Sequence, residues 1–229
     1  MDFNTGDGPE RPEDRSSFDR EAVRPAGGHG GEFDLSDPIN SFVSTVRTLV
    51  LNPVGFFRGI AREGNFLNPL LFAVICALIS GILGGIINFF ITLASGNQGR
   101  GFGGALASLI GSILLTPIFT AIGLLVGAVI YHLLVLLFVR PANAGFEATF
   151  RVVSYISVTQ LVSWIPIIGP IIAFAYGVVL SILGIREVHS TSTGRAALVV
   201  LIPVAVILLL VVVLIALIGA ALFFVSQQS

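Results

Sequence analysis

Long apolar runs without charge occupy most of the chain and predict helices that cross a lipid bilayer. Residues 69–94 carry no charged side chain, and neither do residues 105–139. A bilayer core needs roughly 20 apolar residues in a helix, so the first run predicts one span. The second run is too long for one span and too short for two. We expect a break at Pro117, with a partly inserted piece over 105–115 and a full span over 117–139.

A helical hairpin and a final apolar run follow. Residues 148–165 and 170–185 are predicted to form the hairpin, which either crosses the membrane twice or dips in and returns, and residues 196–225 form the last span. The count is therefore five spans or three. Helices satisfy all their backbone groups within one segment, as lipid demands. We therefore expect an all-α integral membrane fold, a five-span helical bundle over residues 64–229.

Two short amphipathic helices precede the bundle, within residues 37–63. Apolar residues recur at helical spacing in both, with polar residues opposite, and each helix is too short to span a bilayer. Helices of this kind lie in the membrane interface or pack on the protein's own bundle, and the pattern fits both. A polar residue before a proline predicts three helix starts, at Asp37, Asn52 and Asn68.

Residues 1–36 form an acidic tail that is predicted to be disordered. The tail is rich in Gly, Pro, Asp, Glu and Arg, and its few apolar residues show no period. The first 40 residues hold ten acidic side chains against four arginines, whereas the rest of the chain holds eight arginines and three glutamates. A polar stretch of this length before the first apolar segment is not the architecture of a secretory signal. Insertion is therefore expected to use the internal segments.

Arginine positions predict how the chain is oriented. With either hairpin topology, seven arginines fall on one side of the membrane and only Arg100 falls on the other. Positive loops stay in the cytoplasm. We therefore expect a multi-pass protein of a prokaryotic cytoplasmic (inner) membrane, with its N-terminus in the cytoplasm and its C-terminus outside. The seven arginines on the expected cytoplasmic side are Arg47, Arg58, Arg62, Arg140, Arg151, Arg186 and Arg195.

Composition limits the classes of partner. The chain is 55% hydrophobic and 11% charged, whereas soluble domains carry about 25% charged residues. The expected partner is therefore the lipid bilayer. A chain without lysine and without a basic stripe shows no nucleic-acid footprint. A cytosolic protein partner or a second copy of the chain remains open.

No set of residues predicts catalysis, a cofactor or a metal site. The three histidines are far apart in sequence, and no nucleophile motif or phosphate loop is present. His132 is the one ionisable group within a span, which makes it a candidate by default. We favour a neutral His132 that hydrogen-bonds to Gln160 or Tyr155. The alternative is a small-solute permease or channel that uses the broken helices around His132.

The loops on the expected cytoplasmic side hold a cluster of charged groups. One interpretation is a set of solvated side chains that neutralise one another and fix the topology. The other is a surface that faces a cytosolic partner or anionic lipid. The cluster consists of Arg140, Glu147, Arg151, Arg186, Glu187, His189 and Arg195, in which Glu147 and Arg151 form a helical i,i+4 pair.

Four stretches resemble a known membrane family, the Yip-one domain in its prokaryotic form. They are Asn52-Pro-Val-Gly-Phe-Phe-Arg58, Asn68-Pro-Leu-Leu-Phe72, Gly145-Phe-Glu-Ala-Thr-Phe-Arg-Val-Val-Ser-Tyr155 and Gly184-Ile-Arg-Glu-Val-His-Ser-Thr-Ser-Thr-Gly-Arg-Ala196. The last of the four is the most specific. The resemblance covers the chain from about Leu51 to the C-terminus.

The resemblance implies a five-span helical domain with a cytosolic N-terminus. Eukaryotic relatives bind Rab-type GTPases in vesicle transport, but this chain lacks their N-terminal Tyr-Gly-Pro-type motif. For the prokaryotic branch the resemblance implies a fold without a settled activity. We therefore expect a non-enzymatic scaffold, membrane organiser or trafficking-type protein whose cytoplasmic loops dock partners.

Overall fold

The described part of the chain is entirely helical. The computed structural model describes residues 31–95, 101–139 and 143–227. In chain order, the elements are α2 (Pro38–Leu51), α3 (Pro53–Gly59), α4 (Leu67–Ala94), α5 (Gly101–Phe138), α6 (Gly145–Ile156), the 3-10 turn η2 (Ser157–Thr159), α7 (Gln160–Ser163), α8 (Ile168–Val188) and α9 (Thr193–Ser226).

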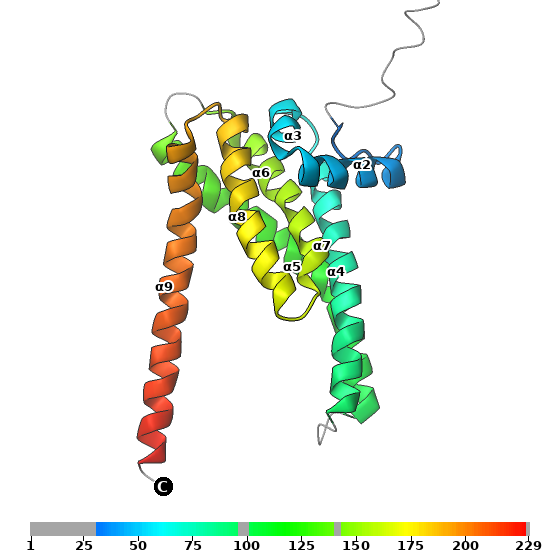
Figure 1. The fold of residues 1–229 in the computed structure, drawn as a ribbon, viewed down its shortest axis with the longest axis vertical. Coiled ribbons are helices and arrows are strands. Elements are labelled where there is room, and N and C mark those ends of the chain that lie inside the picture. The colour runs from blue at the N-terminus through cyan, green and yellow to red at the C-terminus, as the bar shows by residue number, and fades with distance from the viewer. Residues whose placement is uncertain (1–30, 96–100, 140–142, 228–229) are drawn as a thin grey trace, which may run out of the picture.

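Four helices in the described part are long and apolar enough to cross a membrane. They are Leu67–Ala94, Gly101–Phe138, Ile168–Val188 and Thr193–Ala220. The fifth predicted span, 148–165, is divided between α6, η2 and α7, so it does not form one continuous spanning helix. In Figure 1 the turn between α7 and α8 lies well short of the lower ends of α4 and α9. The expected helical membrane fold is confirmed with four candidate spans rather than five.

Helix α5 does not break at Pro117. The structure places this proline inside one continuous helix, so the prediction of a separate piece over 105–115 was wrong. An interior proline removes one backbone hydrogen bond. A break at this depth would leave several backbone groups without partners in lipid, so continuing the helix costs less.

Small residues let α4 and α5 approach each other closely. A Cβ at Gly85 would lie 2.8 Å from Leu109 Cδ1 and 3.0 Å from Ser112 Oγ, and one at Gly81 would lie 3.1 Å from Thr116 Oγ1. Glycines at this spacing bring helix backbones together in membranes, where dispersion contacts drive association.

The three predicted helix starts have different outcomes. Asn52 caps α3, since its Oδ1 accepts the Gly55 N–H at 3.0 Å. Asp37 holds the cap position of α2 but its carboxylate accepts from the Asn40 side chain. Asn68 lies within the first turn of α4, which begins at Leu67, and the Asn65 side chain accepts the Leu67 N–H at 2.6 Å.

Helix α2 packs on the bundle with one face and exposes apolar side chains on another, so both interpretations of the sequence pattern apply. Thr45 and Leu49 are fully buried against the bundle, while Ile39 and Val43 are 77% and 60% exposed. Val50 lines an apolar groove whose other members come from α7, α8 and the 3-10 turn. The exposed apolar stripe therefore continues toward the spanning helices, and in Figure 1 α2 lies across the end of α4. This arrangement suits a helix at the lipid boundary.

The last residues of the tail belong to the core. Phe33 is 1% exposed and packs with Phe42 and Phe72. The prediction of disorder through Ser36 is therefore wrong for residues 31–36, because a buried phenylalanine ring offsets the entropy cost of ordering a short segment. Residues 1–30 lie outside the described residues.

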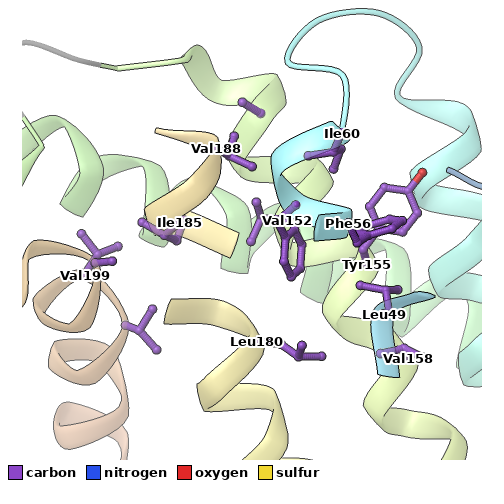
Figure 2. Close-up of a cluster of buried hydrophobic side chains, with 14 of the residues drawn as sticks. Leu49, Phe56, Ile60, Val152, Tyr155, Val158, Leu180, Ile185, Val188 and Val199 are labelled. Atoms are coloured by element: carbon purple, nitrogen blue, oxygen red, sulfur yellow. The ribbon is translucent and has the colours of Figure 1, made fainter. Parts of the chain in front are cut away.

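The core gathers where α3, α6 and α8 meet at one end of the bundle. Figure 2 shows Phe56 and Tyr155 facing each other, with Ile185 and Leu180 entering from α8. The Phe56 and Tyr155 ring centroids are 5.0 Å apart in an edge-on arrangement. We call this the charged end, because every charged side chain in the described part of the chain lies on the elements and connections there (Figure 1).

We expect Gly184→Ala to destabilise the core at this end. A Cβ at Gly184 would lie 2.5 Å from Val152 Cγ1 and 3.2 Å from Phe57 Cε1, and neither a β-branched side chain nor a buried ring yields easily. Overpacking of this kind costs about 1–3 kcal/mol. The measurement is the midpoint of thermal unfolding in detergent. Gly111→Ala is the matched control, since open space surrounds this helical glycine. Equal midpoints for the two variants would contradict the close contact.

Candidate functional site

Arg151 is the centre of a buried ion-pair cluster at the charged end. Its side chain is 6% exposed. Arg151 Nη1 lies 2.6 Å from Glu32 Oε2, and Nη2 lies 3.2 Å from Glu147 Oε1 and donates to the Asn65 carbonyl at 3.1 Å. The predicted i,i+4 pair of Glu147 and Arg151 is confirmed. The structure buries Arg151, whereas the sequence placed it among residues that face a partner or lipid.

Glu32 joins the tail to the membrane domain through three donors. Besides Arg151, its Oε2 accepts from the Tyr155 hydroxyl at 3.0 Å, and its Oε1 accepts the Ala61 N–H at 2.6 Å. The Glu32 side chain is 9% exposed. Buried carboxylates persist only when they are paired and hydrogen-bonded in this way. The cluster is therefore a clasp that fastens residues 31–34 onto α6 and the α3–α4 connection.

A second ion-pair group lies nearer the surface. Glu187 accepts from Arg58 at 3.1 Å and from Arg186 at 2.6 Å, and it links α3 to the end of α8. The Arg58 side chain is 71% exposed. Exposed pairs of this kind contribute about 0–1 kcal/mol each, so they shape the surface more than they stabilise it. Arg62 continues the same surface and donates to Ser190 Oγ at 3.1 Å.

A hydrogen-bonded chain runs from His189 into α5. The Ala144 N–H donates to His189 Nδ1 at 3.1 Å, so the proton of a neutral His189 is on Nε2. That nitrogen lies 3.1 Å from Thr149 Oγ1, and the same hydroxyl lies 3.2 Å from His132 Nδ1. His189 Nε2 therefore donates to Thr149 Oγ1, and this hydroxyl also contacts His132 Nδ1 and the Gly145 carbonyl. The predicted partners of His132, Gln160 and Tyr155, are replaced by Thr149.

The surroundings of His189 favour its neutral form. His189 is 1% exposed. Its burial, followed by the charges of His132 and Arg62, lowers the pKa of His189 from 6.5 to about 4. At neutral pH, His189 is therefore a structural hydrogen-bonding group. Like Arg151, it is not available to a partner.

The remaining cluster residues divide by exposure. Arg195 is exposed in the first turn of α9, and Arg186 and Glu187 are half-buried at the end of α8. Arg140 lies outside the described residues. The structure thus leaves the α8–α9 connection, together with Arg58 and Arg62, as the accessible charged surface.

Sequence reasoning missed Glu32 and Thr149. Glu32 lies 119 residues before its arginine, and Thr149 lies 40 residues before His189. Helical periodicity reports only neighbours three or four positions apart. The one usable signal for the docked tail was the Glu32-Phe33 pair shortly before the first amphipathic helix.

The described residues include a cysteine and an open groove outside the clasp. Among them, no group of three or more His, Cys, Asp or Glu side chains is placed to hold a metal ion. Cys76 is buried in the core. An open groove of about 730 Å³ runs along α5 and is lined largely by small, apolar and hydroxyl residues. His132 is not among the lining residues of this groove.

Comparison with known proteins identifies the family. The model of the Yip1 domain matches residues 47–225. No curated protein gives a match, and neither does a solved structure. The family match covers most of the chain and includes the Arg58–Glu187 and Glu147–Arg151 pairs, whereas Glu32 lies before the matched residues. The protein is therefore a multi-pass membrane protein that belongs to the Yip1 domain family.

Proposed function

We propose that the protein is a non-enzymatic membrane scaffold whose charged end faces the cytoplasm and docks a cytosolic protein. Yip1 family members are generally non-enzymatic membrane proteins of trafficking. The observation that carries the proposal is the gathering of the described charged side chains at one end of the bundle (Figure 1). Basic residues at one end favour a cytoplasmic location.

The docking surface consists of Arg58, Arg62, Arg186, Glu187 and Arg195. Core contacts hold its helices in place: Gly184 of α8 lies against Phe57 of α3. A rigid backbone with exposed guanidinium groups suits recognition of carboxylates on a protein partner. The clasp at Arg151 is buried and is not part of this docking surface.

The permease alternative has less support. The Thr149 hydroxyl is hydrogen-bonded to Nδ1 of His132, and the Phe146 ring lies edge-on to the imidazole, with the two ring centroids 5.5 Å apart. A transported solute would need a polar path to this histidine, with further polar ligands along it. The contacts of His132 instead serve to join α5 to α6.

Photo-cross-linking in intact cells tests the proposal. A photoreactive residue at Ser192, which is exposed in the α8–α9 connection, is expected to give a discrete protein adduct that Arg58→Ala and Arg62→Ala weaken. The matched control is Leu209, which is 63% exposed on the apolar part of α9 and is expected to give lipid adducts only. Equal protein adducts at both positions, or solute flux in liposomes that His132→Ala abolishes, would overturn the scaffold.

A further inference from the structure

The clasp has the properties of a peptide-binding site that holds its own ligand. We propose that the crevice between α2, the α3–α4 connection and α6 binds a glutamate followed by an aromatic residue, and that residues 31–34 occupy it as a removable ligand. This inference concerns a site separate from the exposed docking surface, and its test does not depend on that surface having a partner.

The crevice provides hydrogen-bond donors for the whole carboxylate of the glutamate. Both carboxylate oxygens of Glu32 are used: the Ala61 N–H takes one, and Arg151 and Tyr155 take the other. Charge-assisted hydrogen bonds are shorter and stronger than neutral ones. Three donors from two separate elements fix both the charge and the length of the side chain, because an aspartate in the same backbone position would fall short of Arg151.

Recognition of the aromatic residue uses a ready-made pocket. The Phe33 ring centroid lies 6.5 Å from that of Phe42 and 6.2 Å from that of Phe72. Aromatic rings at these separations attract one another beyond their burial in the core. The pocket comes from Phe42 of α2 and Phe72 of α4, not from the tail itself.

The backbone of the segment is also held. Thr45 Oγ1 donates to the Gly31 carbonyl at 2.9 Å. Ser41 Oγ accepts the Asp34 N–H at 3.1 Å and lies 2.9 Å from the Asp34 carbonyl. Hydrogen bonds on both sides of the Glu32-Phe33 pair set its register, as in sites that recognise short extended peptides.

Residues 31–34 can leave the crevice because no buried charged group then loses all of its partners. Arg151 keeps Glu147 and the Asn65 carbonyl as partners when Glu32 leaves. A buried arginine that lost its only carboxylate would destabilise the fold, and this arrangement avoids that outcome. A polar cavity of about 220 Å³ borders Glu32, Phe33 and Asp34, so incoming peptide has space beside the bound segment.

The test adds a fluorescent peptide with the sequence of residues 30–36 to the full chain in lipid nanodiscs. The chain carries Glu32→Gln and Phe33→Ala, which empty the site. We expect the peptide to bind this chain saturably, as measured by fluorescence anisotropy. Binding to the unsubstituted chain is expected to be at least ~10-fold weaker, because its own tethered segment competes at an effective concentration on the order of millimolar. A peptide with Gln and Ala in place of Glu and Phe is the control.

A second measurement uses the unsubstituted chain and so does not depend on folding of the variant. Excess free peptide is expected to accelerate amide hydrogen exchange of residues 31–36 by ~10-fold or more, as the bound segment is displaced. The control peptide is expected to leave that exchange unchanged. Equal effects of the two peptides, or unchanged exchange with the Glu-Phe peptide at millimolar concentration, would overturn the site.

Discussion

Replacing Arg151 with methionine is expected to destabilise the protein more than any other single change in the charged cluster. The substitution leaves the carboxylates of Glu32 and Glu147 near each other without their shared cation, and the Glu32 side chain is only 9% exposed. Breaking a buried ion pair by removing one partner costs about 3–5 kcal/mol. The measurement is the free energy of unfolding in mixed detergent micelles.

Two further variants isolate the cause of that loss. Arg58→Met removes an arginine whose side chain is 71% exposed, so its expected cost is below about 1 kcal/mol. Adding Glu32→Gln and Glu147→Gln to Arg151→Met is expected to restore part of the stability, because no unpaired charge then remains. A similar loss for Arg58→Met and Arg151→Met would contradict the buried clasp.

The helices that the sequence predicted well are those that local chemistry specifies. Charge-free runs located α4 and α9, and the Asn-Pro signal located the start of α3, where the Asn52 side chain caps the helix. Each of these features depends on side chains within a few positions of one another or on the solvent that surrounds them.

The features that the sequence did not predict depend on distant partners or on lipid. In water, a proline commonly ends a helix because the backbone groups that it leaves unpaired can bind solvent. In lipid no solvent is available, and α5 continues through Pro117. Arg151 looked like a loop cation because Glu32 was assigned to a disordered tail. His132 was expected to hydrogen-bond to Gln160 or Tyr155, whereas helix α6 places Thr149 beside it instead.

The sequence singled out charged loop residues but did not show which of them are buried and which are exposed. Those that the structure describes lie on α6, at the end of α8 and at the start of α9, at one end of the bundle (Figure 1), and Arg140 lies outside the described residues. Packing divides the charged end into two layers. Arg151 and His189 are buried, whereas Arg58 and Arg195 are exposed. Residue type does not encode that division, because a charged side chain is buried only when a partner from elsewhere in the chain meets it.

Stability is expected to fall as the pH drops from about 6.5 to about 4, and His189 is the cause. Burial lowers the pKa of His189 from 6.5 to about 4 in the folded chain. Within this window the unfolded chain therefore binds a proton that the folded chain excludes, and stability rises with pH until it levels off above 6.5. The gap between the two pKa values corresponds to roughly 3 kcal/mol.

His189→Asn isolates this contribution from that of the carboxylates. Asparagine retains an acceptor for the Ala144 N–H but does not titrate. Loss of the bond to Thr149 is expected to lower stability by about 1 kcal/mol at pH 7.5. The measurement is the difference in unfolding free energy between the two chains, taken from pH 4 to pH 7.5. We expect that difference to shrink and then reverse on acidification, because only the unsubstituted chain must exclude a proton from its core. A difference that stays constant with pH would show that His189 is not the group that titrates.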